Sequence, residues 1–175
     1  MKDKSGWLRR RGPIYAVIAL GGFAGGDARY ALGLEWPDKP GVFPWTTFGI
    51  NVSGAFVLAL LLVLILEVWN APVWLRPLLA TGFLGAFTTF SAVTFALVQF
   101  IDSSQWDLFL AYAGFSTLAG LAAASLGMLL GRAWVRARIE HGSRSSAHEG
   151  PRAPAREGSR ADAQEANAAE PEVFP

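Results

Sequence analysis

The sequence predicts an all-α membrane protein with four transmembrane helices, the third of them broken at membrane depth. Hydrophobic residues make up 52% of the chain and charged residues 17%, below the roughly 25% that is usual in a soluble domain. The charges also gather at the N-terminus, in short connections and in the C-terminal part. The apolar stretches between them have the composition of membrane helices, and nothing in this pattern indicates nucleic-acid binding.

Four apolar segments can be assigned, at residues 13–34, 46–69, 74–101 and 108–135. Each reaches the roughly 20 residues that a helix needs to cross a bilayer. Five tryptophans fall at the predicted ends, where an interfacial aromatic belt is typical: Trp45, Trp69, Trp74, Trp106 and Trp134. The contact with membrane lipid therefore extends over most of the chain.

Three regions follow from this composition. Residues 1–12 form a basic N-terminus, which before an apolar run imitates a secretory signal peptide. The apolar run after it is long and carries Arg29, so we expect a membrane helix there and not a signal peptide. Residues 13–136 form the four-helix membrane domain. Residues 137–175 have almost no large apolar side chains, so we expect a disordered tail.

The first segment carries two pairs of spaced glycines and, further on, an arginine. Gly21 with Gly25, and Gly22 with Gly26, form two pairs of small residues that allow helices to approach closely. Arg29 is costly inside a membrane, so we expect it to face the bundle interior or water. The alternative is that its long side chain reaches the outer interface.

Polar residues form stripes on the second and fourth segments. Thr47, Asn51 and Gly54 share one helical face. The Asn51 amide needs a partner in lipid, so it either bonds to another helix or faces a pore and donates to an anion. Tyr112 and Ser116 stand four residues apart, and their hydroxyls either line a path or satisfy each other and the backbone.

The third segment contains the main signal of the sequence, the stretch GFLGAFTTFS at residues 82–91. Two glycines, two threonines and a serine weaken a helix in the middle of the membrane. Non-helical backbone is tolerated there only where protein buries it or where it lines a watery path. We expect the break between Gly85 and Thr89, where freed carbonyls can bind a cation.

The residue inventory argues against an enzyme. The chain has no cysteine, which removes thiolate metal sites and cysteine nucleophiles. Both histidines, His141 and His148, lie in the predicted tail. A hydrolase dyad inside the bilayer would therefore have no histidine.

In this order on a four-helix chain, the motifs resemble the Fluc (CrcB) family of fluoride channels. The resemblance covers roughly residues 13–132. It rests on the first-helix glycines with Arg29-Tyr30, on Thr46-Thr47 with Asn51-Val52-Ser53-Gly54, and on Gly82-Phe83-Leu84-Gly85 with Thr88-Thr89-Phe90-Ser91. It implies a fluoride-selective ion channel that passively exports fluoride and lowers its cytoplasmic concentration.

The resemblance also implies a site. Family members are dimers of antiparallel subunits with two fluoride paths and a central structural sodium ion, which is held by carbonyls of the broken helix. Carried over, it implies that Gly85 and Thr88 hold the sodium. It places Asn51, Phe90, Tyr112, Ser116 and Thr47 along the fluoride path, and Arg29 matches the family's first-helix arginine. Amide and hydroxyl donors, and the positive edge of a phenyl ring, suit a dehydrated anion.

Two positions depart from the family. Val93 stands where a second pore phenylalanine is usual, and Ala96 where a glutamate is frequent. Val93 offers no ring edge, so a pore lined by this subunit alone would lack half of its aromatic pair.

The charges predict an orientation in the cell membrane. With four spans, both termini share a side with the loop at residues 70–73, and near the helix ends that side holds ten lysines and arginines against Lys39 alone on the other. Because positive segments stay inside, we expect both termini in the cytoplasm. A chain that inserts one way would pair with an oppositely oriented homologous subunit, and pairing with itself is the alternative.

Two other functions are compatible with a four-helix membrane protein. A small proton-coupled antiporter or drug exporter needs a carboxylate at membrane depth, and Asp27 is the only candidate. A membrane scaffold would use the glycines for packing alone.

Overall fold

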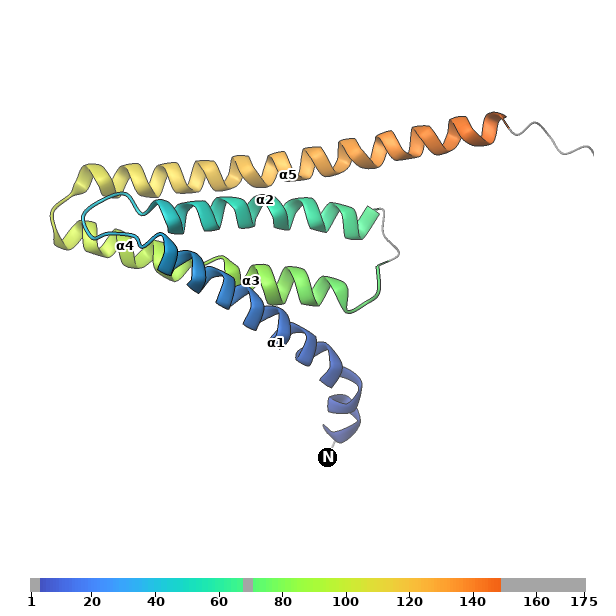
Figure 1. The fold of residues 1–175 in the computed structure, drawn as a ribbon, viewed down its shortest axis with the longest axis horizontal. Helices are drawn as coiled ribbons and strands as arrows, with labels where there is room; N and C mark the ends of the chain where they lie inside the picture. Colours follow the sequence, from blue (N-terminus) through green and yellow to red (C-terminus); the bar gives the residue numbers. More distant parts are fainter. Residues whose placement is uncertain (1–3, 68–70, 149–175) are drawn as a thin grey trace, which may run out of the picture. The chain divides into compact units, whose positions relative to one another are not determined.

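The computed structural model describes the backbone of residues 4–67 and 71–148, with side chains over 12–67 and 71–139. This part of the chain is all-α and has no strand, which confirms the predicted fold class. In chain order the elements are α1 (Lys4–Glu35), α2 (Trp45–Glu67), the π-helix η1 (Pro77–Leu84), α3 (Gly85–Phe87), α4 (Phe90–Asp102) and α5 (Trp106–His148) (Figure 1). Together η1, α3 and α4 form the predicted third segment.

Three stretches are long and apolar enough to cross a membrane: Trp45–Glu67, Pro77–Asp102 and Trp106–Ile139. The chain is therefore a multi-pass membrane protein. α1 has the length, at 32 residues, but is not among these spans. Asp27, Arg29 and the glycines lower the hydropathy of α1, so its crossing of the membrane stays a prediction.

α1 packs closely against η1 through glycine. A Cβ atom at Gly21 would overlap the carbonyl oxygen of Leu78, and one at Gly25 would overlap that of Phe83. The second predicted pair behaves differently, because a Cβ at Gly22 would have its nearest neighbour 3.9 Å away and one at Gly26 would meet nothing within 4 Å. Of the two predicted pairs, Gly21 with Gly25 is therefore the one that brings the backbones of α1 and η1 together.

α5 lies against α2 in the same manner. A Cβ atom at Gly127 would overlap the backbone of Phe56, and one at Gly131 would come within 2.9 Å of the Val63 side chain. The helix also runs to His148, beyond the predicted end at residue 135, because alanine, arginine and glutamate in this stretch favour helix. The predicted tail thus begins inside α5, and residues 149–175 lie outside the described residues.

The predicted break is present. α3 ends at Phe87, and Thr88 and Thr89 have extended backbone, with ψ angles of 152° and 115°. α4 then starts at Phe90, so the third segment crosses in two helical halves (Figure 1). The π-helical geometry of η1 was not expected from the sequence.

Candidate functional site

Asn51, on α2, forms hydrogen bonds to the extended backbone between α3 and α4. Its Nδ2 donates to the carbonyl of Thr89 at 2.9 Å, and its Oδ1 accepts from the Thr89 amide at 2.8 Å. A backbone N–H can only donate, which fixes the orientation of the side-chain amide. Of the two interpretations of Asn51, the interhelical bond is the one seen. The Asn51 oxygen replaces the acceptor that the Thr89 amide would have in an unbroken helix, and the Asn51 amide adds a second donor to a carbonyl that also caps α4.

This arrangement frees two carbonyls. In an unbroken helix the amide of Thr89 would bond to Gly85, and that of Ala92 to Thr88. Here the Thr89 amide donates to Asn51, and the Ala92 amide donates to Thr89 Oγ1 at 3.2 Å. Gly85 and Thr88 therefore lose their helical donors, and their carbonyl oxygens are of the type that coordinates alkali cations.

Arg29 reaches the same break from α1. Its Nε donates to the carbonyl of Ala86 at 3.0 Å, in a half-buried position. The side chain thus points inward, as expected for an intramembrane arginine, instead of extending to the interface. It places a positive charge beside the backbone of α3.

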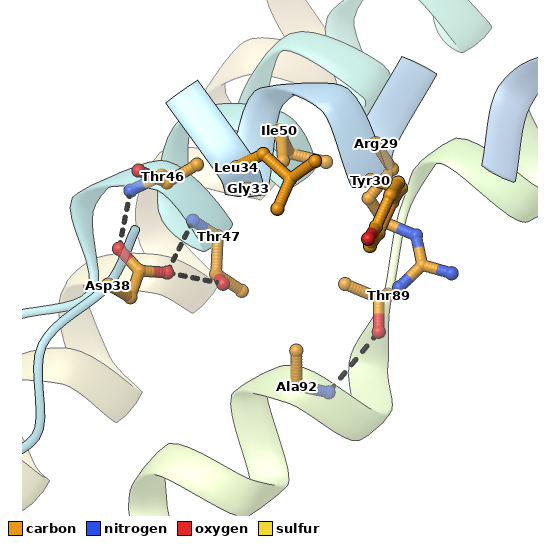
Figure 2. Close-up of a pocket in the computed structure, with 10 residues that line it drawn as sticks. All are labelled: Arg29, Tyr30, Gly33, Leu34, Asp38, Thr46, Thr47, Ile50, Thr89 and Ala92. Carbon is orange, nitrogen blue, oxygen red and sulfur yellow. Dashed lines mark hydrogen bonds between the residues drawn. The ribbon is translucent and has the colours of Figure 1, made fainter. Parts of the chain in front are cut away.

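These elements line a partly open cavity of about 380 Å³, which we call the inner cavity. Arg29 and Thr89 lie on one side of it, and Asp38 with Thr47 on the other (Figure 2). The structure thus brings Arg29, Thr47 and the break around one space.

Asp38, which the sequence reasoning did not single out, binds the first turn of α2. Its Oδ1 accepts from the Thr46 amide at 2.9 Å. Its Oδ2 accepts from the Thr47 amide at 3.0 Å and from the Thr47 hydroxyl at 2.7 Å. The carboxylate lies too far from α2 along the chain for a standard capping motif, so only the folded loop reveals it.

Tyr112 and Ser116 occupy a separate place, on α5. Tyr112 is fully buried, with its ring edge-on to Phe43 at 5.1 Å and to Phe100 at 6.2 Å between centroids. The hydroxyl oxygens of Tyr112 and Ser116 are buried and lie near each other, but neither makes a hydrogen bond of good geometry among the described residues. Buried hydroxyls are normally bonded, so this pair suits a ligand that accepts hydrogen bonds.

Phe90 lies at the surface of the subunit. It is the first residue of α4 and its side chain is 83% exposed. The structure therefore does not bring Phe90 into the inner cavity, and its ring is available to a molecule outside this chain.

Comparison with known proteins covers the same region. The family described as "CrcB-like protein, Camphor Resistance (CrcB)" matches residues 16–128. The Streptomyces avermitilis protein named fluoride-specific ion channel FluC 3 is 46% identical over 136 residues, which are 78% of this chain and 67% of that protein.

For two further relatives, the match spans a larger share of the relative's own length. FluC 1 of Streptomyces coelicolor is 42% identical over 137 residues, 78% of this chain and 85% of the relative. FluC of Magnetococcus marinus is 38% identical over 120 residues, 67% of this chain and 96% of the relative. The matched region includes the break, the Asn51 bonds across it and the inward Arg29. The chain belongs to the CrcB family.

Proposed function

We propose that this protein is a fluoride-selective channel that lets fluoride leave the cell passively and so lowers its cytoplasmic concentration. The observation that carries the proposal is the identity of 42–46% to proteins named fluoride-specific ion channels. The buried hydroxyls of Tyr112 and Ser116 support it, because a fluoride ion that sheds water needs such donors.

The fluoride path uses donors of several kinds. Tyr112 and Ser116 supply hydroxyls, and Asn51 retains a second amide hydrogen besides the one given to Thr89. Phe90 offers the positive edge of its exposed ring. Thr47 also lies on this path, but its hydroxyl donates its hydrogen to the Asp38 carboxylate. Thr47 therefore acts on fluoride indirectly, by holding that carboxylate in place.

A structural sodium ion at Gly85 and Thr88 is part of the proposal. The loss of helical donors at both carbonyls supports it. Two oxygens leave the coordination of a sodium ion incomplete, so the remaining ligands come from a second subunit. Bound there, the ion adds fixed positive charge beside the path and joins the two broken helices.

We further propose an antiparallel dimer with an oppositely oriented homologous subunit, with pairing of identical chains as the alternative. The exposed Phe90 supports a partner, since a ring at the surface of one subunit can line a path only against another. The excess of positive charge on one side of the chain supports a single orientation and both termini in the cytoplasm.

Efflux from sealed liposomes tests the function. We expect fluoride to leave passively through the full-length protein, alone or with its homologous partner, while chloride is retained. Phe90→Ala should cut fluoride flux, whereas Phe23→Ala, an equally exposed ring on α1, should not. Flux that needs a proton gradient would favour the antiporter, and no flux in any assembly would favour the scaffold.

The antiporter is not favoured by the relatives, whose names describe channels. Its required carboxylate, Asp27, is exposed on α1 and does not line the inner cavity.

A further inference from the structure

The N-terminus of α2 is occupied by a carboxylate of the chain itself. The first amides of a helix have no acceptor within it, and the positive end of the helix favours an anion. The amides of Thr46 and Thr47 and the Thr47 hydroxyl all donate to Asp38. Three donors that would otherwise be open to a small anion are thus taken by one side chain.

Asp38 also stands between two cavities. The inner cavity lies on one side, with Arg29 and Thr89 in its lining. A second cavity of about 270 Å³, the outer cavity, lies under the loop and is lined by Lys39, Gln99 and Phe100 among others. Asp38 and Thr47 belong to the lining of both, so their hydrogen-bonded pair forms part of the shared wall.

The charges in these linings are few. Among the described residues, Arg29 is the only basic residue lining the inner cavity and Lys39 the only one lining the outer cavity. Asp38 is the only acidic residue of the described chain that lines either of them. An anion placed between these two positive charges would therefore lie beside a single carboxylate.

We propose that fluoride passes between these two cavities, and that Asp38 is a positioning residue that sets the anion affinity there by filling the anion-favouring end of α2. A channel must bind its ion weakly enough to release it. With Asp38 in place, the donors of Thr46 and Thr47 do not hold fluoride, and it moves on between Arg29 and Lys39. This inference rests on the proposed function.

The test measures fluoride flux against fluoride concentration in liposomes, with the full chain in the assembly that shows wild-type activity. Asp38→Ala should lower the half-saturating fluoride concentration about twofold to fivefold, as expected for an anion freed to bind a helix N-terminus. Asp38→Asn removes the charge but keeps one acceptor, so its shift should be smaller. Asp38→Glu should return the value toward wild type.

Glu35→Gln is the matched control, because it removes a neighbouring negative charge that lines neither cavity. It should leave the half-saturating concentration unchanged. A merely structural role for Asp38 would reduce the amount of folded channel, measured by size-exclusion chromatography, and leave half-saturation unchanged in every variant.

The outcomes separate the two proposals. If the wild-type protein passes fluoride but Asp38→Ala has an unchanged or raised half-saturating concentration, the proposed role of Asp38 is overturned and the proposed function stands. A wild-type protein that passes no fluoride, alone or with its partner, would overturn the proposed function and this inference with it.

Discussion

At the scale of single residues, the break depends on side chains that bond to backbone. Asn51 satisfies both the amide and the carbonyl of Thr89, and Arg29 satisfies the carbonyl of Ala86. Backbone groups without partners are costly in a membrane, since lipid offers no hydrogen bonds. These two side chains therefore make an interrupted helix possible at this depth.

Asn51→Ala should destabilise the protein as well as reduce fluoride flux. It leaves the Thr89 amide without its acceptor, at a cost of about 1–3 kcal/mol where the amide stays buried, whereas the Thr89 carbonyl keeps its donor in the first turn of α4. Ser53→Ala is the control, because the Ser53 hydroxyl bonds only to carbonyls of its own helix. Thermal unfolding in detergent and liposome flux measure the two effects. A normal melting temperature in Asn51→Ala would show that the bonds across the break do not stabilise it.

The sequence shows which residues at the break are unusual but not how they pair. The glycines, threonines and serine of 82–91 predict the interruption because they weaken a helix. The sequence does not identify the partner of Asn51, since an amide on an apolar helix gives the same pattern whether it faces a helix or a pore. Asp38 gave no signal, because its bonds to α2 exist only once the proline-rich loop has folded back.

At the scale of elements, α1 and η1 are held together by backbone contact. The carbonyls of Leu78 and Phe83 lie where Cβ atoms of Gly21 and Gly25 would be. The spacing of the glycines predicted close packing but not which pair would be used. Which pair is used depends on the direction in which η1 crosses α1. That direction is set by tertiary packing and cannot be read from the residues around the glycines.

Gly25→Ala should impair folding, whereas Gly26→Ala should not. The added methyl group at Gly25 overlaps backbone atoms of Phe83, which cannot rotate away, and overpacking of this kind costs typically about 1–3 kcal/mol. At Gly26 the same group meets nothing within 4 Å in this chain. Thermal unfolding of both variants measures the difference. Equal melting temperatures would contradict the close packing of α1 on η1.

Gly85→Val should weaken assembly and sodium dependence and leave the fold of the subunit intact. A Cβ at Gly85 has its nearest neighbour, the Ala80 oxygen, at 3.8 Å, so the chain itself has room for it. A partner that shares a sodium ion would meet the larger side chain. Thr88→Ser should be mild, because its hydroxyl can keep the bond to Leu84.

The measurement is the melting temperature and oligomeric state in sodium chloride against N-methylglucamine chloride. If Gly85→Val keeps the sodium response of the wild type, the ion lies elsewhere.

At the scale of the whole molecule, positive charge lies on one side of the predicted spans. The ten residues are Lys2, Lys4, Arg9, Arg10, Arg11, Arg76, Arg132, Arg136, Arg138 and Arg144. A chain that forms antiparallel dimers with itself must insert in both directions, which requires nearly balanced loops. In this chain the positive charges of the two sides are far from balanced.

C-terminal reporter fusions should therefore report one orientation. A fluorescent protein that matures only in the cytoplasm should be bright, and an alkaline phosphatase that works only outside should be inactive. Co-expression with an oppositely oriented homologue should raise fluoride resistance. Activity of both reporters, or strong resistance from this chain alone, would indicate that identical chains pair instead.

The order in which the break acquires its partners matters for biosynthesis. Arg29 and Asn51 lie on α1 and α2, both of which precede Ala86 and Thr89 in the chain. When the interrupted segment leaves the ribosome, the two side chains that satisfy its backbone have already been synthesised. The break can then enter the bilayer next to residues that complete its hydrogen bonds, before α5 follows it.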